Sequence, residues 1–299
     1  GANAAVQPLS VDIDLRDTRL RANQFPYQMT DLAGRVEWRP DNVRLVGLHG
    51  RLGDAPAEIA GEVNIAQSAA NTPPAEISFI VHGLPLDDRL RRALDDQTRK
   101  ALDSLQPRGK VDVSCILQPT GGPGQLIRRL VIDLDQCEAT YAAFPYPLQG
   151  LTGRVVIEDG IATLHNISGR KGTSTVAISG TLHLTQLDPH EVGLLALDEL
   201  VVQVRNAAFD SDLENALPRE LLAAWQTLEP EGGFDADLFL SWLPGSPIWL
   251  DEGSTLRTRD VRLCGFRTPD MTLPLRLDDD WFSIRQISGS LYGGMVQGS

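Results

Sequence analysis

Cysteine is scarce in this chain of 299 residues, with Cys115, Cys137 and Cys264 as its three thiols. Three widely separated cysteines form neither a disulfide framework nor a CxxC metal site. Cys115 falls on the apolar parity of the alternating segment Val111–Leu117, so we expect it to be a buried structural thiol.

Motifs of catalysis and metal binding are also lacking. The five histidines show no HxxxH or HExxH spacing, and the GxSxG pattern of a nucleophile elbow does not occur. The run Asp278–Asp280 lacks the alternating spacing and the distal glutamate of a calcium loop, so we expect it to form a turn. We therefore expect no enzymatic activity, no bound metal and no cofactor.

Long apolar runs and clustered positive charge are missing as well. No stretch of about 18 apolar residues occurs, and the first residues lack the pattern of a signal peptide. The net charge is −13, and no basic stripe with interleaved aromatic residues is present, which argues against a nucleic-acid partner. Recognisable pattern reaches both ends of the sequence, so we expect a piece of a longer protein, with any anchor or export signal outside it.

What the sequence does contain is a segment that occurs twice. Leu90–Asp112 returns as Leu213–Asp235, 123 positions later. Its apolar positions recur at the helical spacing i, i+3, i+4, and Asp87 and Asp210 stand where a helix N-cap is expected. We therefore expect one amphipathic helix in each copy, at 87–106 and 210–229, with its apolar face against a sheet. The apolar matches are Leu90/Leu213, Leu94/Leu217, Leu102/Trp225 and Leu105/Leu228.

The duplication extends upstream of these helices. Phe25-Pro26-Tyr27 returns as Phe144-Pro145-Tyr146 at an offset of 119, and Leu32–Val36 returns as Leu151–Val155 at the same offset. The offset changes from 119 to 123 across Gln67–Pro74 and Thr185–Gly193, as a loop with a four-residue insertion would give, and we expect a loop at 66–74.

Short alternating runs of apolar and polar residues fill the rest of the chain. They are separated by turn residues at the roughly 8–12-residue spacing of an antiparallel meander. We predict a mainly β protein, an elongated and curved antiparallel sheet built of tandem repeats of about 120 residues, each with one inserted amphipathic helix. The first repeat is expected at 1–124, the second at 125–247, and a partial third at 248–299.

Nine apolar residues share one parity of their strands and form the expected binding surface. Because side chains alternate between the faces of a sheet, they should line one apolar surface on its concave side. Two helices cannot cover so large a sheet, and acyl chains could bury the remainder at roughly 0.8 kcal/mol per methylene. The alternative is a sheet that folds on itself around the helices. The nine residues are Ile13, Leu15, Ile77, Phe79, Val81, Val111, Val113, Ile132 and Leu134.

The C-terminal part of the chain resembles a known hairpin. Leu275–Ile284 holds two apolar runs around the acidic turn, and Ile287–Gly298 reads ISGSLYGGMVQG. This order is similar to the recurring hairpin of the AsmA-like superfamily, which includes TamB-type envelope proteins. The corresponding segments of the earlier copies, Gly50–Gly53 and Gly169–Gly172, lack the Leu-Tyr pair.

The resemblance implies a function that composition and spacing alone do not reach. It implies a periplasmic part of a longer, inner-membrane-anchored protein, which binds or conducts phospholipid along an apolar groove for outer-membrane biogenesis. The implied partners are phospholipid or another acyl lipid, the cell membrane through segments outside this sequence, and envelope assembly proteins. The alternative is a structural or scaffolding β-repeat with a closed core, which binds protein partners through its sheet edges.

Overall fold

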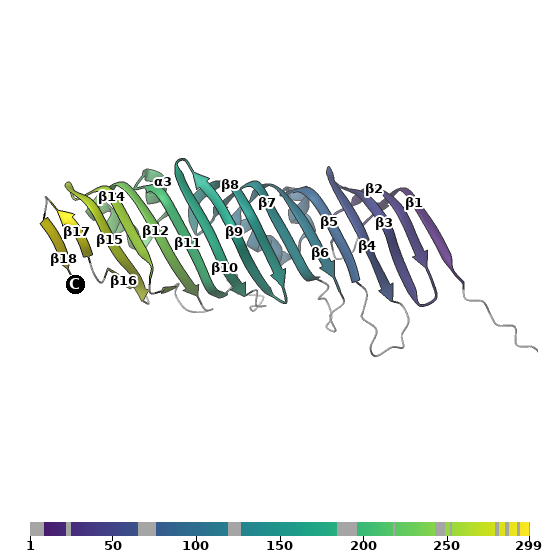
Figure 1. The fold of residues 1–299 in the computed structure, drawn as a ribbon. Helices are drawn as coiled ribbons and strands as arrows, with labels where there is room; N and C mark the ends of the chain where they lie inside the picture. Colours follow the sequence, from purple (N-terminus) through teal and green to yellow (C-terminus); the bar gives the residue numbers. More distant parts are fainter. Residues whose placement is uncertain are drawn as a thin grey trace, which may run out of the picture. The chain divides into compact units, whose positions relative to one another are not determined.

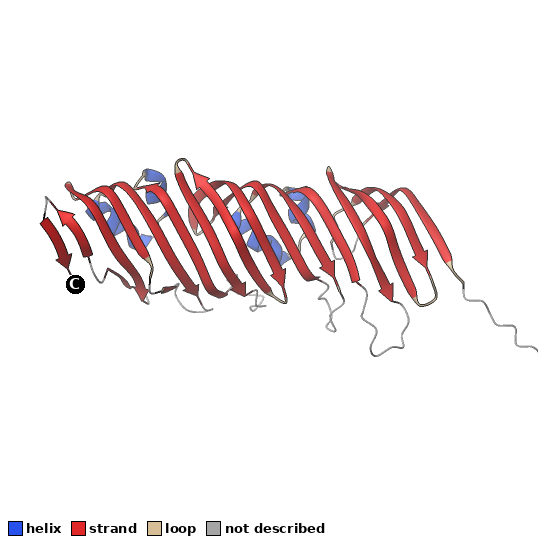
Figure 2. Ribbon diagram, in the orientation of Figure 1, coloured by secondary structure: helices blue, strands red, loops and turns tan. Residues whose placement is uncertain are grey.

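The chain is mainly β-strand with few helices, as the sequence predicts (Figure 2). The computed structural model describes residues 9–21, 25–64, 76–118, 127–183, 196–217, 219–242, 249–251, 253–278, 281–284, 287–291 and 294–298. The expected loop at 66–74 and the connection at 119–124 lie outside these residues, and the expected turn at 278–280 lies outside them apart from Asp278.

The chain divides into two compact units. Unit 1 comprises Gly1–Asp95, Lys110–Asp133 and Ile157–Asp159, and unit 2 comprises Asp96–Gly109, Leu134–Val156 and Gly160–Ser299. The strands β7 (Ile127–Tyr141) and β8 (Phe144–Glu158) contribute residues to both units. The division into repeats of about 120 residues is a separate matter and stays a prediction.

Unit 1 contains an antiparallel meander in which each strand pairs with the next along the chain (Figure 1). Residues with left-handed backbone, such as Asp31 with a φ of 54°, mark shifts in the register. The strands are β1 (Val11–Leu20), β2 (Met29–Trp38), β3 (Asn42–Leu52), β4 (Ala55–Asn64), β5 (Glu76–Pro85) and β6 (Arg108–Leu117).

Unit 2 follows the same antiparallel principle from β9 onward (Figure 1). The strand β13 is a two-residue addition that pairs with both β12 and β15. The strands are β9 (Ile161–Lys171), β10 (Ser174–His183), β11 (Ala196–Ala208), β12 (Glu231–Trp242), β13 (Trp249–Leu250), β14 (Thr255–Leu263), β15 (Phe266–Asp278), β16 (Trp281–Ile284), β17 (Ile287–Leu291) and β18 (Gly294–Gly298).

Each expected helix is in fact a pair of shorter helices. The segment 87–106 forms α1 (Asp88–Ala93) and α2 (Asp96–Leu105), and the segment 210–229 forms α3 (Ser211–Ala216) and α4 (Arg219–Leu228). The break falls at Leu94 and Leu217, whose ψ angles of 151° and 143° are extended. Leu217 precedes a proline, which disfavours the helical conformation of the residue before it. The prediction of one continuous helix per copy was therefore wrong.

The N-caps were predicted correctly. The Asp87 side chain accepts hydrogen bonds from the backbone N–H groups of Arg89 and Leu90, at 2.9 and 3.0 Å. The Asp210 side chain accepts one from the N–H of Leu213 at 2.8 Å. These bonds satisfy donors that have no partner within the first turn of a helix.

The expected apolar helix faces are buried only in part. Leu90 and Ala93 of α1 are buried, whereas Leu94 is half-buried. Leu105 and Leu228 are 48% and 41% exposed, so the prediction that they face a sheet was wrong. Each is followed by a residue with left-handed backbone, which ends the helix and turns the chain toward the next strand.

We expect Leu90→Ala to lower the free energy of unfolding by roughly 2–5 kcal/mol, because the substitution leaves a cavity between α1 and the sheet. Leu105→Ala, at an exposed position, should change it by less than about 0.5 kcal/mol. Chemical denaturation followed by circular dichroism measures both variants. If Leu90→Ala lowers the free energy of unfolding no more than Leu105→Ala does, Leu90 makes no stabilising buried contact.

Candidate functional site

The two faces of the unit 1 sheet differ in chemistry. Residues directly opposite each other in an antiparallel pair point to the same face. One register row crosses all six strands and carries only apolar residues and glycine. Its members are Ile13, Val36, Leu45, Gly61, Ile77 and Leu117. We call the face that holds this row the apolar face of unit 1.

Seven of the nine predicted groove residues lie on this face. Val81 pairs with Val113, and the register continues through a shift to Leu84 opposite Val111. Ile13 and Leu15 pair with Val36 and Gly34 on the same face. The predicted residues on the apolar face are Ile13, Leu15, Ile77, Phe79, Val81, Val111 and Val113.

The other two predicted residues belong to β7. Ile132 and Leu134 are both half-buried, and their spacing of two places them on the same face of that strand. Ile132 falls in unit 1 and Leu134 in unit 2. The expectation that they continue the surface formed by the other seven stays a prediction.

Burial on the apolar face of unit 1 changes along the strands. Near α1 the side chains are fully packed: Val81 has 0% exposure, and its neighbours Ala57, Leu84 and Val111 are buried. At the row that crosses all six strands, Ile77 and the residues beside it are half-buried, and Ile13 on the first strand is 46% exposed. The face is thus a closed core at one end and partly open to solvent at the other.

Unit 2 shows the same gradient on its own apolar face. Ala207, Phe234 and Ala236 form a buried cluster against which Leu213 of α3 packs. Farther along the same strands, the row of Gly180, Leu200, Leu240 and Leu250 is half-buried. In Figure 1, α3 lies behind the strands of unit 2, on one side of the sheet. The helices therefore cover one end of the strands and leave the other partly open.

Cys115 lies within the apolar face of unit 1, opposite Phe79. It is buried, as predicted, and burial raises the pKa of its thiol to about 11. A thiol with a raised pKa carries little thiolate, so Cys115 is a packing residue with low reactivity. Cys137 is also buried, whereas Cys264 is exposed.

The opposite faces of the sheets are polar and carry ion pairs. Arg35 contacts Asp14 at 2.8 Å in unit 1, and in unit 2 Asp237 lies between Arg205 and Arg257, at 2.5 and 3.5 Å. The Arg35–Asp14 pair is exposed and contributes about 0–1 kcal/mol, whereas the Asp237 side chain is only 15% exposed. The ion pairs identify these faces as solvated surfaces.

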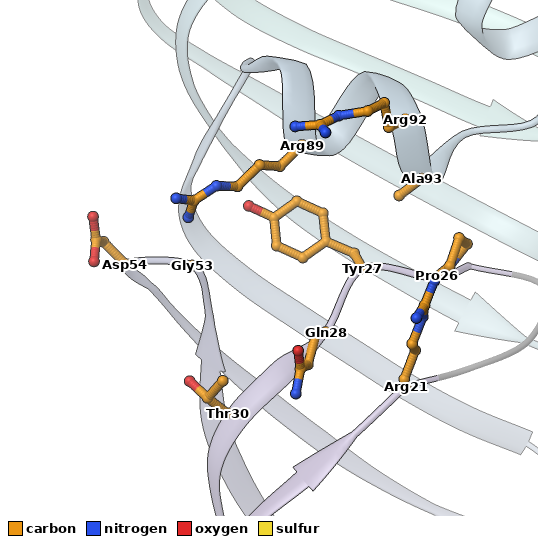
Figure 3. A pocket seen from close by; sticks show the side chains of 10 residues that line it. All are labelled: Arg21, Pro26, Tyr27, Gln28, Thr30, Gly53, Asp54, Arg89, Arg92 and Ala93. Carbon is orange, nitrogen blue, oxygen red and sulfur yellow. The ribbon is translucent and has the colours of Figure 1, made fainter.

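A second feature of unit 1 is a pocket of about 600 Å³ at the α1 end of its strands. It is lined by Arg21, Pro26, Tyr27, Gln28, Thr30, Gly53, Asp54, Arg89, Arg92 and Ala93. Figure 3 shows the Tyr27 ring below α1, with its hydroxyl toward the Arg89 side chain. Three arginines against one aspartate give the lining a formal charge of +2. We call this site the arginine pocket.

The sequence does not reveal the arginine pocket as a site. Phe25-Pro26-Tyr27 stands out as a repeated motif, but Arg89 and Arg92 are ordinary helix residues in the sequence. Their contact with Tyr27 arises only when α1 folds onto the sheet. The one available signal is the change from Arg89 to Asp212 at the matching position of the second copy.

Among the described residues, no group of three or more histidine, cysteine, aspartate or glutamate side chains is arranged to hold a metal ion. The helices of this part of the chain have six to ten residues, and none of them could span a membrane. The sequence matches no model of a known protein family, no curated protein and no solved structure.

Proposed function

We propose that this chain is a non-enzymatic lipid-binding module, which holds acyl chains on the partly open ends of its apolar sheet faces. The observation that carries the proposal is the burial gradient, in which one continuous apolar face runs from a closed core under the helices to half-exposed side chains. A closed β protein would bury this row. A contiguous apolar surface that stays partly accessible to solvent is a candidate binding site.

The chemistry of the exposed row fits acyl chains. Its side chains are aliphatic, as at Val36, Leu45 and Ile77, and they offer no hydrogen-bonding group on that face. Each methylene of a lipid that leaves water there contributes roughly 0.8 kcal/mol. The polar opposite face stays solvated, so the lipid has one preferred side.

The alternative function, a scaffold that binds protein partners through strand edges, has less support. The first strand, β1, carries exposed charged residues at Asp12, Asp14 and Arg16. Charged side chains on an edge strand oppose pairing with another chain. An apolar face that is partly open also argues against a closed core.

We further propose that the chain is a tandem duplication. The backbone supports this: Gly61 and Gly180 have φ angles of 152° and 149°, and Gln106 and Glu229 both have 42°. These pairs are separated by 119 and 123 positions, the two offsets of the sequence matches. A side-chain contact repeats as well. The N–H of Gly83 donates to Asp112 at 2.7 Å, and the N–H of Asn206 donates to Asp235 at the same distance.

On this basis the AsmA-like, TamB-type resemblance becomes a specific proposal. The chain would act in the periplasm as part of a longer, inner-membrane-anchored protein, and its ligand would be phospholipid that is destined for the outer membrane. Support comes from the mainly β fold, the proposed duplication and the partly open apolar faces. Protein partners in envelope assembly belong to the same proposal.

Ile77→Asp tests the groove. A carboxylate among acyl chains is poorly solvated, so binding of a fluorescent phospholipid should weaken roughly tenfold or more. The protein should stay folded by circular dichroism, because Ile77 is only half-buried and a charge there can reach water.

Ile80→Asp is the matched control for this experiment. Ile80 is in the same strand, is also half-buried and points to the opposite face. It should leave lipid binding unchanged. If Ile77→Asp unfolds the protein, the face is a closed core, and if it binds lipid like the wild type, this row is no part of a groove.

A further inference from the structure

Tyr27 carries a buried hydroxyl that has no hydrogen-bond partner. The side chain is 8% exposed, and its oxygen contacts no donor or acceptor in the described part of the chain. Leaving a buried hydroxyl unpaired costs about 1–3 kcal/mol, so native structures rarely do so without reason. The hydroxyl lines the arginine pocket. It therefore marks a place where a ligand atom is expected.

The phenol is suited to donate a hydrogen bond. Burial raises its pKa, and the negative charges of Asp87 and Asp54 raise it further, while Arg89 lowers it. Tyr27 therefore keeps its proton and can donate to an oxygen atom of a ligand.

Gly53, between β3 and β4, lies close to both polar groups of the pocket. A Cβ at Gly53 would stand 3.0 Å from the Tyr27 hydroxyl and 3.8 Å from Nη1 of Arg89. The phenol and the guanidinium are therefore neighbours in the lining of the pocket. One carboxylate, Asp54, faces three arginines in the lining of the pocket.

The second copy of the Phe-Pro-Tyr motif, Phe144-Pro145-Tyr146, has protein side chains next to its tyrosine. Tyr146, 119 positions after Tyr27, has the Ser174 side chain beside its hydroxyl, and Lys171 lies 5.5 Å from the centroid of its ring. Lys171 in turn pairs with Asp212 at 2.6 Å. The second site thus has both a partner for its hydroxyl and a counter-charge for its cation.

The first copy lacks both of these partners. Ala55 stands where the second copy has Ser174, so this position supplies no hydroxyl to Tyr27. Arg89 stands where the second copy has Asp212, which exchanges an acidic residue for a basic one. The first copy therefore offers the Tyr27 hydroxyl and the positive charge of Arg89. In the second copy the positive charge of Lys171 is neutralised by Asp212.

We propose that the arginine pocket binds the phosphate group of a phospholipid, with Arg89 and the Tyr27 hydroxyl as its direct contacts. Arginine is the side chain best matched to phosphate, because its planar fork donates two parallel hydrogen bonds. Arg21 and Arg92 add positive charge at the rim. The proposal rests on the proposed lipid-binding function and specifies its ligand as a phosphate-bearing lipid. Leu20, next to Arg21 and 44% exposed, begins the apolar side of β1 along which a tail can lie.

Three probes separate phosphate recognition from tail recognition. Dihexanoyl phosphatidic acid carries both groups, dihexanoylglycerol carries the tails alone, and glycerol 3-phosphate carries the phosphate alone. Titration calorimetry on the full chain at low salt should rank phosphatidic acid first. Arg89→Gln and Tyr27→Phe should each weaken its binding roughly tenfold, and added salt should weaken it as well.

Arg44→Gln is the control, because Arg44 is exposed on the polar face of β3. It should leave binding unchanged. Tyr27→Phe should keep the protein at least as stable as the wild type, since it removes an unpaired hydroxyl. A loss of affinity in that variant therefore reports a lost contact with the ligand.

The outcomes distinguish the two proposals. If dihexanoylglycerol binds as tightly as phosphatidic acid and Arg89→Gln has no effect, the groove stands and the phosphate site is overturned. If glycerol 3-phosphate binds in an Arg89-dependent way, the tails add nothing to it and dihexanoylglycerol does not bind, the phosphate site stands and the lipid groove fails. If none of the three probes binds, both proposals are wrong.

Discussion

Val81→Asp is expected to unfold unit 1, lowering its free energy of unfolding by about 4 kcal/mol or more. Val81 has 0% exposure and lies between Ala57 and Val113 in the register. A carboxylate at this position has neither water nor a cationic partner on the apolar face. The substitution also removes the packing of a fully buried side chain. Denaturant titration followed by circular dichroism measures the loss.

The comparison with Ile77→Asp gives this experiment its meaning. Val81 and Ile77 lie on the same face of the same strand, four residues apart, and differ only in how far that face is covered. One aspartate should unfold the protein, and the other should remove lipid binding from a folded protein. If both variants unfold, the apolar face is closed along its whole length and the lipid proposal fails. If both fold normally, the burial gradient has no energetic consequence.

Alternation along the strands was enough to predict which residues share a face. Val111, Val113 and Cys115 were placed together by parity alone, and the register confirms it. Parity says nothing about what covers a face. No pattern within β5 encodes the difference between buried Val81 and half-buried Ile77.

The helices show where periodicity fails. Leu90 and Leu94 are followed after about two turns by a further apolar pair, Leu102 and Leu105, so the sequence favours one helix. The extended backbone at Leu94 interrupts it and makes the second half a separate helix. The cap at Asp87 was predictable because capping is a local hydrogen bond. The break at Leu217 also has a local cause, the proline that follows it, whereas apolar spacing does not encode the exposure of Leu105.

The arginine pocket depends on distant contacts in the same way. It joins Tyr27, from the segment before β2, to Arg89 of α1, and neither residue is unusual in its own segment. The comparison of the two copies is more informative than either copy alone. Where one sequence offers a matched pair of sites, the residue that changes sign between them is the first candidate for function.

The close approach of β4 to β5 gives the last prediction, on Gly61→Ala. A Cβ at Gly61 would lie 2.8 Å from the Cα of Ile77, and closer still to the carbonyl oxygen of Glu76. Both atoms belong to the backbone of β5, so the strands would have to separate. The φ angle of 152° adds strain for any residue with a side chain. We expect a loss of about 3 kcal/mol in the free energy of unfolding.

Comparison with Gly47→Ala separates the cost of the close approach from the cost of backbone strain. Gly47 also has a positive φ, of 58°, but a Cβ there meets no atom within 4 Å. It should cost only the backbone strain, about 1 kcal/mol. Gly180→Ala, at the matching place in unit 2, should repeat the effect of Gly61→Ala, because its Cβ would lie 2.9 Å from the Cα of Leu200. Thermal unfolding measures the three variants. If their melting temperatures all fall equally, the close approach of the strands adds nothing to the cost of a side chain. A large loss at Gly61 with none at Gly180 would contradict the proposed duplication at this position.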